Sequence, residues 1–126
     1  MNNQEFGKNL INRSFRFAKS IIYLADSLPG KQSTRVILDQ LLRSATSVGA
    51  NIVEAQAASS RKDFTNFLNH ALKSGNETKF WLLLLIETSP DKKTEILDIV
   101  KESEELTKIL GSVIASLRGK RKISNL

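Results

Sequence analysis

The chain has 126 residues, enough for one domain with a single hydrophobic core, and its hydrophobic (40%) and charged (25%) shares are those of an ordinary soluble globular protein. It has no cysteine and one histidine, His70, which excludes disulfides, thiol nucleophiles, cysteine-ligated metals and metal sites with two histidines. Its 19 basic and 13 acidic residues give a net charge of +6, which favours a polyanionic partner, most often nucleic acid.

The N-terminal segment MNNQEFGKNLINRS has no apolar run bounded by a cleavage site, so it does not resemble a secretory signal. The longest apolar run of the chain, residues 80–86, is far shorter than the roughly 20 residues that span a bilayer. We therefore expect a soluble, cytoplasmic protein without a membrane partner.

The first predicted helix spans residues 9–27 and ends at a Leu-Pro-Gly sequence that disfavours further helix. Its apolar residues recur at three- and four-residue steps, as on one face of a helix. They form two adjoining stripes, Ile11, Phe15, Ala18, Ile22 and Ala25, and Phe17, Ile21, Leu24 and Leu28. The outer face carries cations that we expect to bind nucleic acid: Lys8, Arg16 and Lys19, with Arg13 alongside.

The second predicted helix spans residues 33–58, with Ser33 or Thr34 as its N-cap. Its core stripe is apolar at regular three- and four-residue steps: Leu38, Leu41, Ala45, Val48, Ile52 and Ala55. A neighbouring stripe is polar: Arg43, Ser47, Asn51 and Glu54. Serine and asparagine are weak helix formers, so we interpret this stripe as part of a structural polar network that fixes how helices pack.

The third predicted helix spans residues 60–87 and begins with Ser60 as N-cap and Asp63 three residues later. Its inward residues are expected to be Phe64, Phe67, Leu68, Ala71, Leu82 and Leu85. Ser74 and Glu77 belong to a polar stripe beside them and complete the predicted network. Antiparallel pairing of the second and third helices places Arg43 opposite Glu77, so we expect these two side chains to form a hydrogen-bonded ion pair.

The carboxylates allow a different interpretation, in which Glu54, Glu77 and Asp63 supply acid–base chemistry or hold a cation. Arg43 would neutralise such a site, and the chain offers no second histidine. We therefore expect no catalytic residue, no metal and no cofactor in this protein.

Residues 80–86 (FWLLLLI) are apolar around the whole circumference of the third helix. One side of a helix in a four-helix monomer ordinarily faces water, so part of this segment needs a cover. Large exposed apolar patches are uncommon on monomers, and we expect a second copy of the chain to provide the cover. The predicted oligomer interface consists of Phe80, Trp81, Leu83 and Leu84.

The fourth predicted helix spans residues 92–117 and follows a turn at Pro90. Its core positions alternate strictly at three and four residues: Ile96, Ile99, Ser103, Leu106, Leu110, Val113 and Leu117. The chain therefore divides into one domain, residues 1–117, and a flexible basic tail, residues 118–126. We expect the cations of this tail to bind nucleic acid: Arg118, Lys120, Arg121 and Lys122.

Four helices of this length joined by short connections predict an all-α fold, an antiparallel up-down-up-down four-helix bundle. Because residues 80–86 need a cover, we expect the bundle to assemble into a closed cyclic oligomer, which leaves no end of the assembly uncovered.

The segment LLRSATSVGANIVEAQAASSRKDFTNFLNHALKSGNETKFWL resembles a family of small bacterial four-helix-bundle proteins, first noticed as products of intervening sequences in 23S ribosomal RNA genes. The family pattern is roughly QLxRSAxSIxxNIxEG followed by KDFxxFLxxAxxSxxExxxxL, and the similarity extends over about residues 15–117. Val48 stands where isoleucine is usual. The chain matches the pattern at Gln40, Leu41, Arg43, Ser44, Ala45, Ser47, Asn51, Ile52 and Glu54, and then at Lys62, Asp63, Phe64, Phe67, Leu68, Ala71, Ser74 and Glu77.

The same family includes the accessory variability determinant proteins of diversity-generating retroelements. The resemblance implies a non-enzymatic bundle that assembles into a basic homopentamer and has affinity for RNA or DNA. In the retroelement branch it also implies association with a reverse transcriptase.

These observations predict a non-enzymatic oligomeric scaffold that contacts nucleic-acid phosphates. Tyr23 is the one aromatic residue expected to be exposed, so stacking on bases is not expected to give sequence specificity. The alternative is a purely structural or protein-recruiting oligomer without affinity for nucleic acid.

Overall fold

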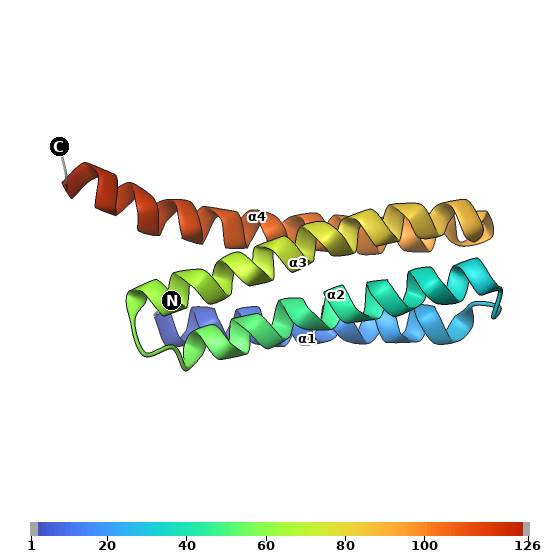
Figure 1. The fold of residues 1–126 in the computed structure, drawn as a ribbon, viewed down its shortest axis with the longest axis horizontal. Helices are drawn as coiled ribbons and strands as arrows, with labels where there is room; N and C mark the ends of the chain where they lie inside the picture. Colours follow the sequence, from blue (N-terminus) through green and yellow to red (C-terminus); the bar gives the residue numbers. More distant parts are fainter. Residues whose placement is uncertain (1–2, 125–126) are drawn as a thin grey trace.

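The computed structural model describes residues 3–124, with side chains as far as Gly119. Four α-helices follow one another: α1 (Asn3–Ser27), α2 (Gln32–Gln56), α3 (Arg61–Thr88) and α4 (Lys93–Ser124). One turn of 3-10 helix, η1 (Pro90–Lys92), joins α3 to α4. Successive helices run antiparallel, and both ends of the chain lie at the same end of the bundle (Figure 1). The predicted all-α fold with four helices is confirmed, and the described residues form no strand.

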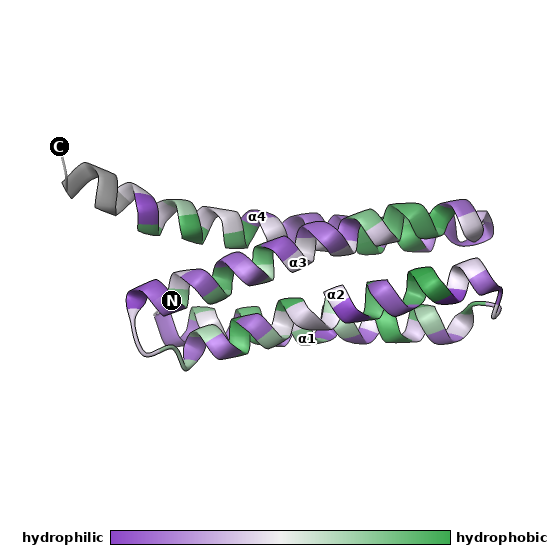
Figure 2. Ribbon diagram, viewed as in Figure 1, coloured by the Kyte–Doolittle hydropathy of each residue, from purple (hydrophilic) through white to green (hydrophobic). Residues whose placement is uncertain are grey.

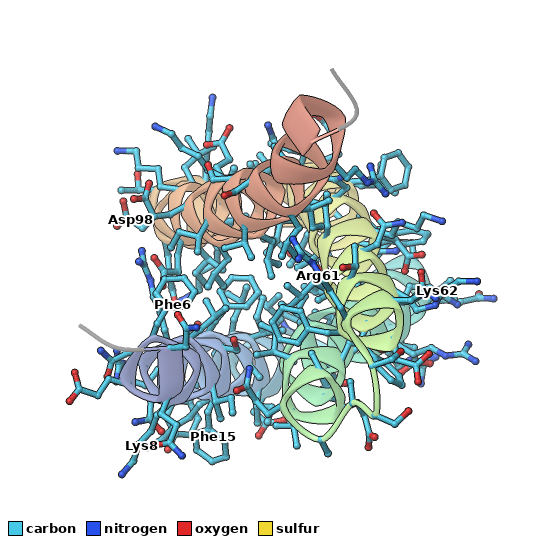
Figure 3. All side chains as sticks on the ribbon, turned by 90° about the vertical axis from the view of Figure 1, so that its left-hand side faces the viewer. Phe6, Lys8, Phe15, Arg61, Lys62 and Asp98 are labelled. Carbon is cyan, nitrogen blue, oxygen red and sulfur yellow. The ribbon has the colours of Figure 1, made fainter. Side chains whose placement is uncertain are left out.

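The four helices pack unequally around the core. α2 and α3 make the most extensive contact, α1 packs on α2, α4 packs on α3, and α1 and α4 make only a small contact. Among the described residues, the backbones of α1 and α3 do not approach closely, nor do those of α2 and α4, so each of these pairs is diagonal in the bundle. In the end-on view of Figure 3, side chains that include Phe6 occupy the space between α1 and α4. The bundle is therefore closed least tightly along its α1–α4 side.

The core combines hydrophobic residues from all four helices, and hydrophobic residues recur along the length of each helix (Figure 2). The predicted core stripe of α2 is buried as a whole. On α4, however, Val100 and Ile114 are buried, whereas Ile99 and Val113 are half-buried. Strict alternation of three and four residues repeats every 3.5 residues, and a straight helix with about 3.6 residues per turn drifts away from that repeat. This drift explains why the buried face of α4 departs from the predicted stripe.

α1 buries only one of its two apolar stripes. Phe17, Ile21 and Leu24 are buried, whereas Phe15 and Ile22 of the other stripe are 71% and 42% exposed. Ser14 lies on the buried side, and its hydroxyl donates to the Leu10 carbonyl at 2.6 Å. A Cβ built on Gly49 of α2 would lie 3.3 Å from the Ser14 Cβ, so the two helices approach closely there. The short side chains at this contact determine which stripe faces inward.

The helix starts agree with the sequence at α3 but not at α2. Ser60 is the N-cap of α3, and its side chain accepts a hydrogen bond from the Asp63 N–H at 3.1 Å, as predicted. α2 has Lys31 as its N-cap residue, without a side-chain cap, so the prediction of Ser33 or Thr34 is wrong. The Lys31 N–H bonds to the Pro29 carbonyl at 3.0 Å, and this turn starts the helix at Gln32.

The backbone of α4 continues to Ser124, seven residues beyond the predicted end at Leu117. In Figure 1 this end of α4 projects beyond the other three helices. Helical backbone therefore extends through residues 118–124, which belong to the basic tail expected from the sequence. The flexibility of this basic tail stays a prediction. None of the helices within residues 3–124 has the length and apolar character required to cross a membrane.

Candidate nucleic-acid interface

Three of the predicted phosphate-binding cations, Lys8, Arg16 and Lys19, lie on the exposed side of α1. This side faces outward because α1 buries the stripe that includes Phe17 and Ile21. Figure 3 shows Lys8 pointing away from the bundle. Within the described part of the chain, none of the three cations forms an ion pair. From Lys8 to Lys19 the helix rises about 16 Å at 1.5 Å per residue, so the three cations are spread along three turns of α1.

Arg13 is on the same helix but is not free for a ligand. Its Nε and one terminal nitrogen each donate to a carboxylate oxygen of Glu102 on α4, both at 2.8 Å. The hydrogen bonds to Glu102 raise the pKa of Arg13, partial burial opposes this, and the charges of Glu102 and Glu105 add to the increase. This two-point ion pair joins the two helices that otherwise touch least. Arg13 therefore stabilises the bundle, unlike the other cations of the predicted set.

The C-terminal part of α4 brings further cations to the end of the bundle where the chain also begins. Arg118 is exposed, and the side chains of Lys120, Arg121 and Lys122 lie outside the described residues. A terminal nitrogen of Arg61, in the first turn of α3, donates to the Leu117 carbonyl at 3.4 Å.

Sequence reasoning missed Arg61 and its exposed neighbour Lys62 as candidate cations. The predicted antiparallel topology could have identified them, because it brings the start of the third helix beside the end of the fourth. In the end-on view of Figure 3, Arg61 and Lys62 lie on α3, across the bundle from Lys8 on α1. Cations from three helices therefore occur at this end of the molecule.

The predicted polar network forms in part. The Ser74 hydroxyl donates to the Ser47 hydroxyl at 2.9 Å across the α2–α3 contact, and the Asn51 amide donates to the same Ser47 oxygen at 3.0 Å. One turn away, the Thr78 hydroxyl donates to the Ser44 hydroxyl at 3.0 Å. Ser44 and Thr78 were missed because the sequence alone does not distinguish a buried hydroxyl from a surface one.

The expected pair of Arg43 and Glu77 does not form, and this prediction is wrong. Both side chains are exposed, and Glu77 accepts a hydrogen bond from the Trp81 indole at 3.3 Å on its own helix. The observed pairs place Ser44 and Ser47 opposite Thr78 and Ser74, so the true register agrees with the expected one to within two residues. The small residues form the contact, and the longer charged side chains extend into solvent, where their pairing contributes little.

The carboxylates of the enzyme hypothesis have separate local roles. Asp63 lies in the first turn of α3, where its N–H donates to the Ser60 hydroxyl and its carboxylate accepts a hydrogen bond from the Ser59 hydroxyl at 2.8 Å. Glu77 bonds to Trp81, and Glu54 is exposed on α2. Among the described residues, no three histidine, aspartate or glutamate side chains come close enough together to hold a metal ion.

The predicted oligomer interface is a partly exposed apolar surface of α3, here called the α3 ridge: Phe80, Trp81, Leu83 and Leu84. Trp81 and Leu84 also line a groove of about 630 Å³ between α3 and the start of α2. Phe80, Leu83 and Leu84 are 57%, 43% and 37% exposed. The rings of Phe80 and Trp81 stack edge to face, with centroids 5.0 Å apart. No other described element of the chain covers the exposed faces of these side chains. The ridge is an apolar surface of the kind that marks an interaction site.

A second apolar surface was not expected from the sequence. It is a groove of about 620 Å³ between α1 and α2, here called the α1–α2 groove. The exposed stripe of α1 forms one wall, and small residues of α2 form the floor. The main lining residues are Ile11, Phe15, Ala18 and Ile22 of α1 with Thr46, Gly49, Ala50 and Val53 of α2. Phe15 and Phe80 are exposed alongside Tyr23, so the expectation that Tyr23 is the one exposed aromatic residue is wrong.

Comparisons with known proteins agree with these features. Residues 8–112 match the model of a family described as 23S rRNA-intervening sequence protein. The crystal structure of a protein with unknown function from the S23 ribosomal protein family of Bacteroides thetaiotaomicron VPI-5482 is similar, with 44% sequence identity and a TM-score of 0.78. The alignment covers 86% of this chain and 96% of that one. No curated protein matches the chain.

Proposed function

Because the chain belongs to the 23S rRNA-intervening sequence protein family, we propose that it is a non-enzymatic scaffold that binds nucleic acid through phosphate contacts. The observation that carries this proposal is the row of exposed, unpaired cations Lys8, Arg16 and Lys19 on one side of α1. A net charge of +6 adds a long-range attraction for polyanions. The family description, which names ribosomal RNA, favours a role in the cytoplasm.

The chemistry of these residues favours phosphates over bases. Lysine and arginine on a helix surface neutralise the backbone charge of RNA or DNA without reading its sequence. Tyr23 is 63% exposed, but the Lys19 ammonium lies 5.6 Å from the centroid of its ring. This cation occupies one face of the ring. We therefore propose binding with little sequence preference, to RNA or to DNA.

We further propose that Arg118, Lys120, Arg121 and Lys122 extend the phosphate-binding surface at the end of α4. Helical backbone through Ser124 supports this part of the proposal, because it projects the segment away from the bundle (Figure 1). Arg61 and Lys62 at the start of α3 add positive charge nearby.

The scaffold part of the proposal is a closed cyclic homo-oligomer, with five subunits favoured by the resemblance noted above. The exposed α3 ridge supports self-association. Repetition around a ring would multiply the cations of each copy into a continuous basic surface. The same resemblance extends the proposal to a reverse transcriptase as the protein partner.

A filter-retention assay tests the proposed function. The full-length protein is expected to retain structured RNA and duplex DNA at about 50 mM salt and to release both as salt rises. Failure to retain either polymer at low salt would favour the alternative function, an oligomer that recruits a protein. The exposed α1–α2 groove is the observation that favours this alternative.

A further inference from the structure

The α3 ridge and the α1–α2 groove are complementary in form. The ridge presents bulky side chains outward, with Phe80 57% exposed and Leu83 43% exposed. The groove has a floor of Gly49 and Ala50, whose small side chains leave room for an inserted group. Its walls remain apolar, because Phe15 is 71% exposed and lines the groove. Exposed bulky apolar side chains on α3 and an apolar groove between α1 and α2 thus occur on the same chain.

One copy of the chain does not fill its own groove. The ridge is on α3, whereas the groove is formed by α1 and α2, and no ridge residue lines it. α1 and α3 lie diagonally across the bundle. In Figure 3 the labelled Phe15 points away from the bundle beneath α1, on a different side from α3. A contact between the two surfaces therefore joins different copies.

The charges at the two surfaces are also complementary. Glu77 and Glu87 are exposed on α3 on either side of the ridge, and Lys73 lies one turn beyond Glu77. Lys19 lines the groove, and within residues 3–119 it forms no ion pair. Complementary charges at the margin of an apolar contact steer the approach of two molecules and fix their register.

We propose that the α3 ridge of one copy inserts into the α1–α2 groove of the next copy. This inference rests on the proposed self-association and identifies the two surfaces that meet. The contact is heterologous, because each copy contributes a different surface on each side, and repetition of one rotation closes such contacts into a ring. Lys19 lines the groove and then lies at the contact between copies, where it is no longer available to phosphates.

Cross-linking provides the test, because the chain has no cysteine of its own. Asn76→Cys places a thiol on the exposed surface of α3 one turn before Phe80, and Thr46→Cys places one in the groove. A short bis-maleimide is added to each single variant, and to the double variant, in the full-length protein. We expect no covalent dimer from either single variant and a ladder of covalent oligomers from the double variant. The highest band of the ladder counts the subunits of the ring.

Each of four results would overturn the proposal. A covalent dimer from Asn76→Cys alone indicates that two ridges meet, and one from Thr46→Cys alone indicates that two grooves meet. Absence of any product from the double variant, while light scattering still reports an oligomer, overturns the ridge-to-groove contact but leaves the proposed assembly intact. A monomer by light scattering overturns both.

A second pair of variants tests the groove without cross-linking. Ala50→Arg fills the floor of the groove with a charged side chain, whereas Ala115→Arg makes the same change on an exposed position of α4 outside the groove. We expect Ala50→Arg to shift the protein to monomers and Ala115→Arg to leave the oligomer unchanged. Equal oligomer size for both variants, each with a native circular dichroism spectrum, contradicts the proposal.

Discussion

The Thr78 hydroxyl lies 3.0 Å from the Ser44 hydroxyl, and this hydrogen bond crosses the α2–α3 contact. Both residues are buried, with exposed fractions of 0% for Thr78 and 4% for Ser44. The Thr78 hydroxyl also lies 2.7 Å from the Ser74 carbonyl oxygen, and the Ser44 hydroxyl donates to the Leu41 carbonyl at 3.2 Å. No buried side-chain nitrogen or oxygen of the described residues lacks a partner. The hydroxyls therefore fix the register of α2 and α3 without an unsatisfied group.

Thr78→Val keeps the shape of this side chain and removes its hydrogen bonds. The expected loss is about 1–2 kcal/mol of unfolding free energy, because the Ser44 oxygen stays buried without its donor from α3. Urea unfolding at a fixed protein concentration measures it. Thr65→Val is the matched control, since the Thr65 hydroxyl bonds only within α3, to the Arg61 carbonyl at 2.9 Å. Equal losses of unfolding free energy in the two variants would show that the hydrogen bond between α2 and α3 does not contribute to stability.

Gly75→Ala is expected to destabilise the bundle by about 1–3 kcal/mol through overpacking. A Cβ at Gly75 would lie 2.5 Å from the Thr107 Cγ2 on α4, so the Thr107 side chain would have to rotate or the two helices would have to separate. Gly111→Ala is the opposite case, because its Cβ meets nothing within 4 Å and alanine favours helix. It should stabilise by about 0.5–1 kcal/mol. Thermal unfolding of both variants measures the difference, and stabilisation by Gly75→Ala would contradict the close α3–α4 contact.

Arg13→Gln and Arg16→Gln separate the two roles of arginine on α1. Arg13→Gln breaks the ion pair with Glu102 and should cost about 0.5–1 kcal/mol, since both side chains are about one-third exposed. It should leave the salt dependence of RNA binding unchanged. Arg16→Gln should leave stability unchanged and reduce the slope of log K against log salt by about 0.7–0.9 for each phosphate that the variant no longer neutralises. A loss of stability in Arg16→Gln, together with a changed salt dependence of RNA binding in Arg13→Gln, would contradict the roles given to these two residues.

Neutralising the end of α4 tests the second basic segment. The change of Arg118, Lys120, Arg121 and Lys122 to glutamine together is expected to weaken binding to RNA and to flatten its salt dependence, because four cations are removed. The oligomer size in light scattering should not change, since the α3 ridge and the α1–α2 groove are untouched. A variant that binds as tightly as the unmodified chain at every salt concentration would exclude this segment from the interface.

Much of the fold could be predicted because apolar residues recur with a regular helical period, and because proline, glycine and serine mark the connections between helices. Leu41, Ile52 and Leu85 have the expected burial, and Ser60 forms the expected cap. The buried face of α1 was harder to predict, because this helix carries two apolar stripes side by side. Periodicity identifies an apolar face but does not say which half of it a neighbouring helix covers. That depended on the close approach of Ser14 and Gly49, which is a tertiary contact.

The candidate site was less predictable than the fold. The exposed cations Lys8 and Arg16 follow from helix geometry alone, whereas the engagement of Arg13 depends on Glu102, which is far away in the sequence. The polar network was recognised through Ser47, Asn51 and Ser74, but the expected ion pair of Arg43 and Glu77 was not formed. The register of two helices shows which residues lie opposite one another, but not which of them form a hydrogen bond. Glu77 bonds to Trp81 on its own helix instead of to Arg43 on α2.

The affinity of the full-length protein for a structured RNA and for a duplex DNA, measured between about 50 and 200 mM salt, tests the central claim most directly. Six or more phosphate contacts predict that affinity for both polymers falls about 1,000-fold over this range, with a linear plot of log K against log salt. Little difference among sequences of equal length is expected. No binding at the lowest salt, or binding that is insensitive to salt, would contradict the claim that this protein is a phosphate-contacting scaffold.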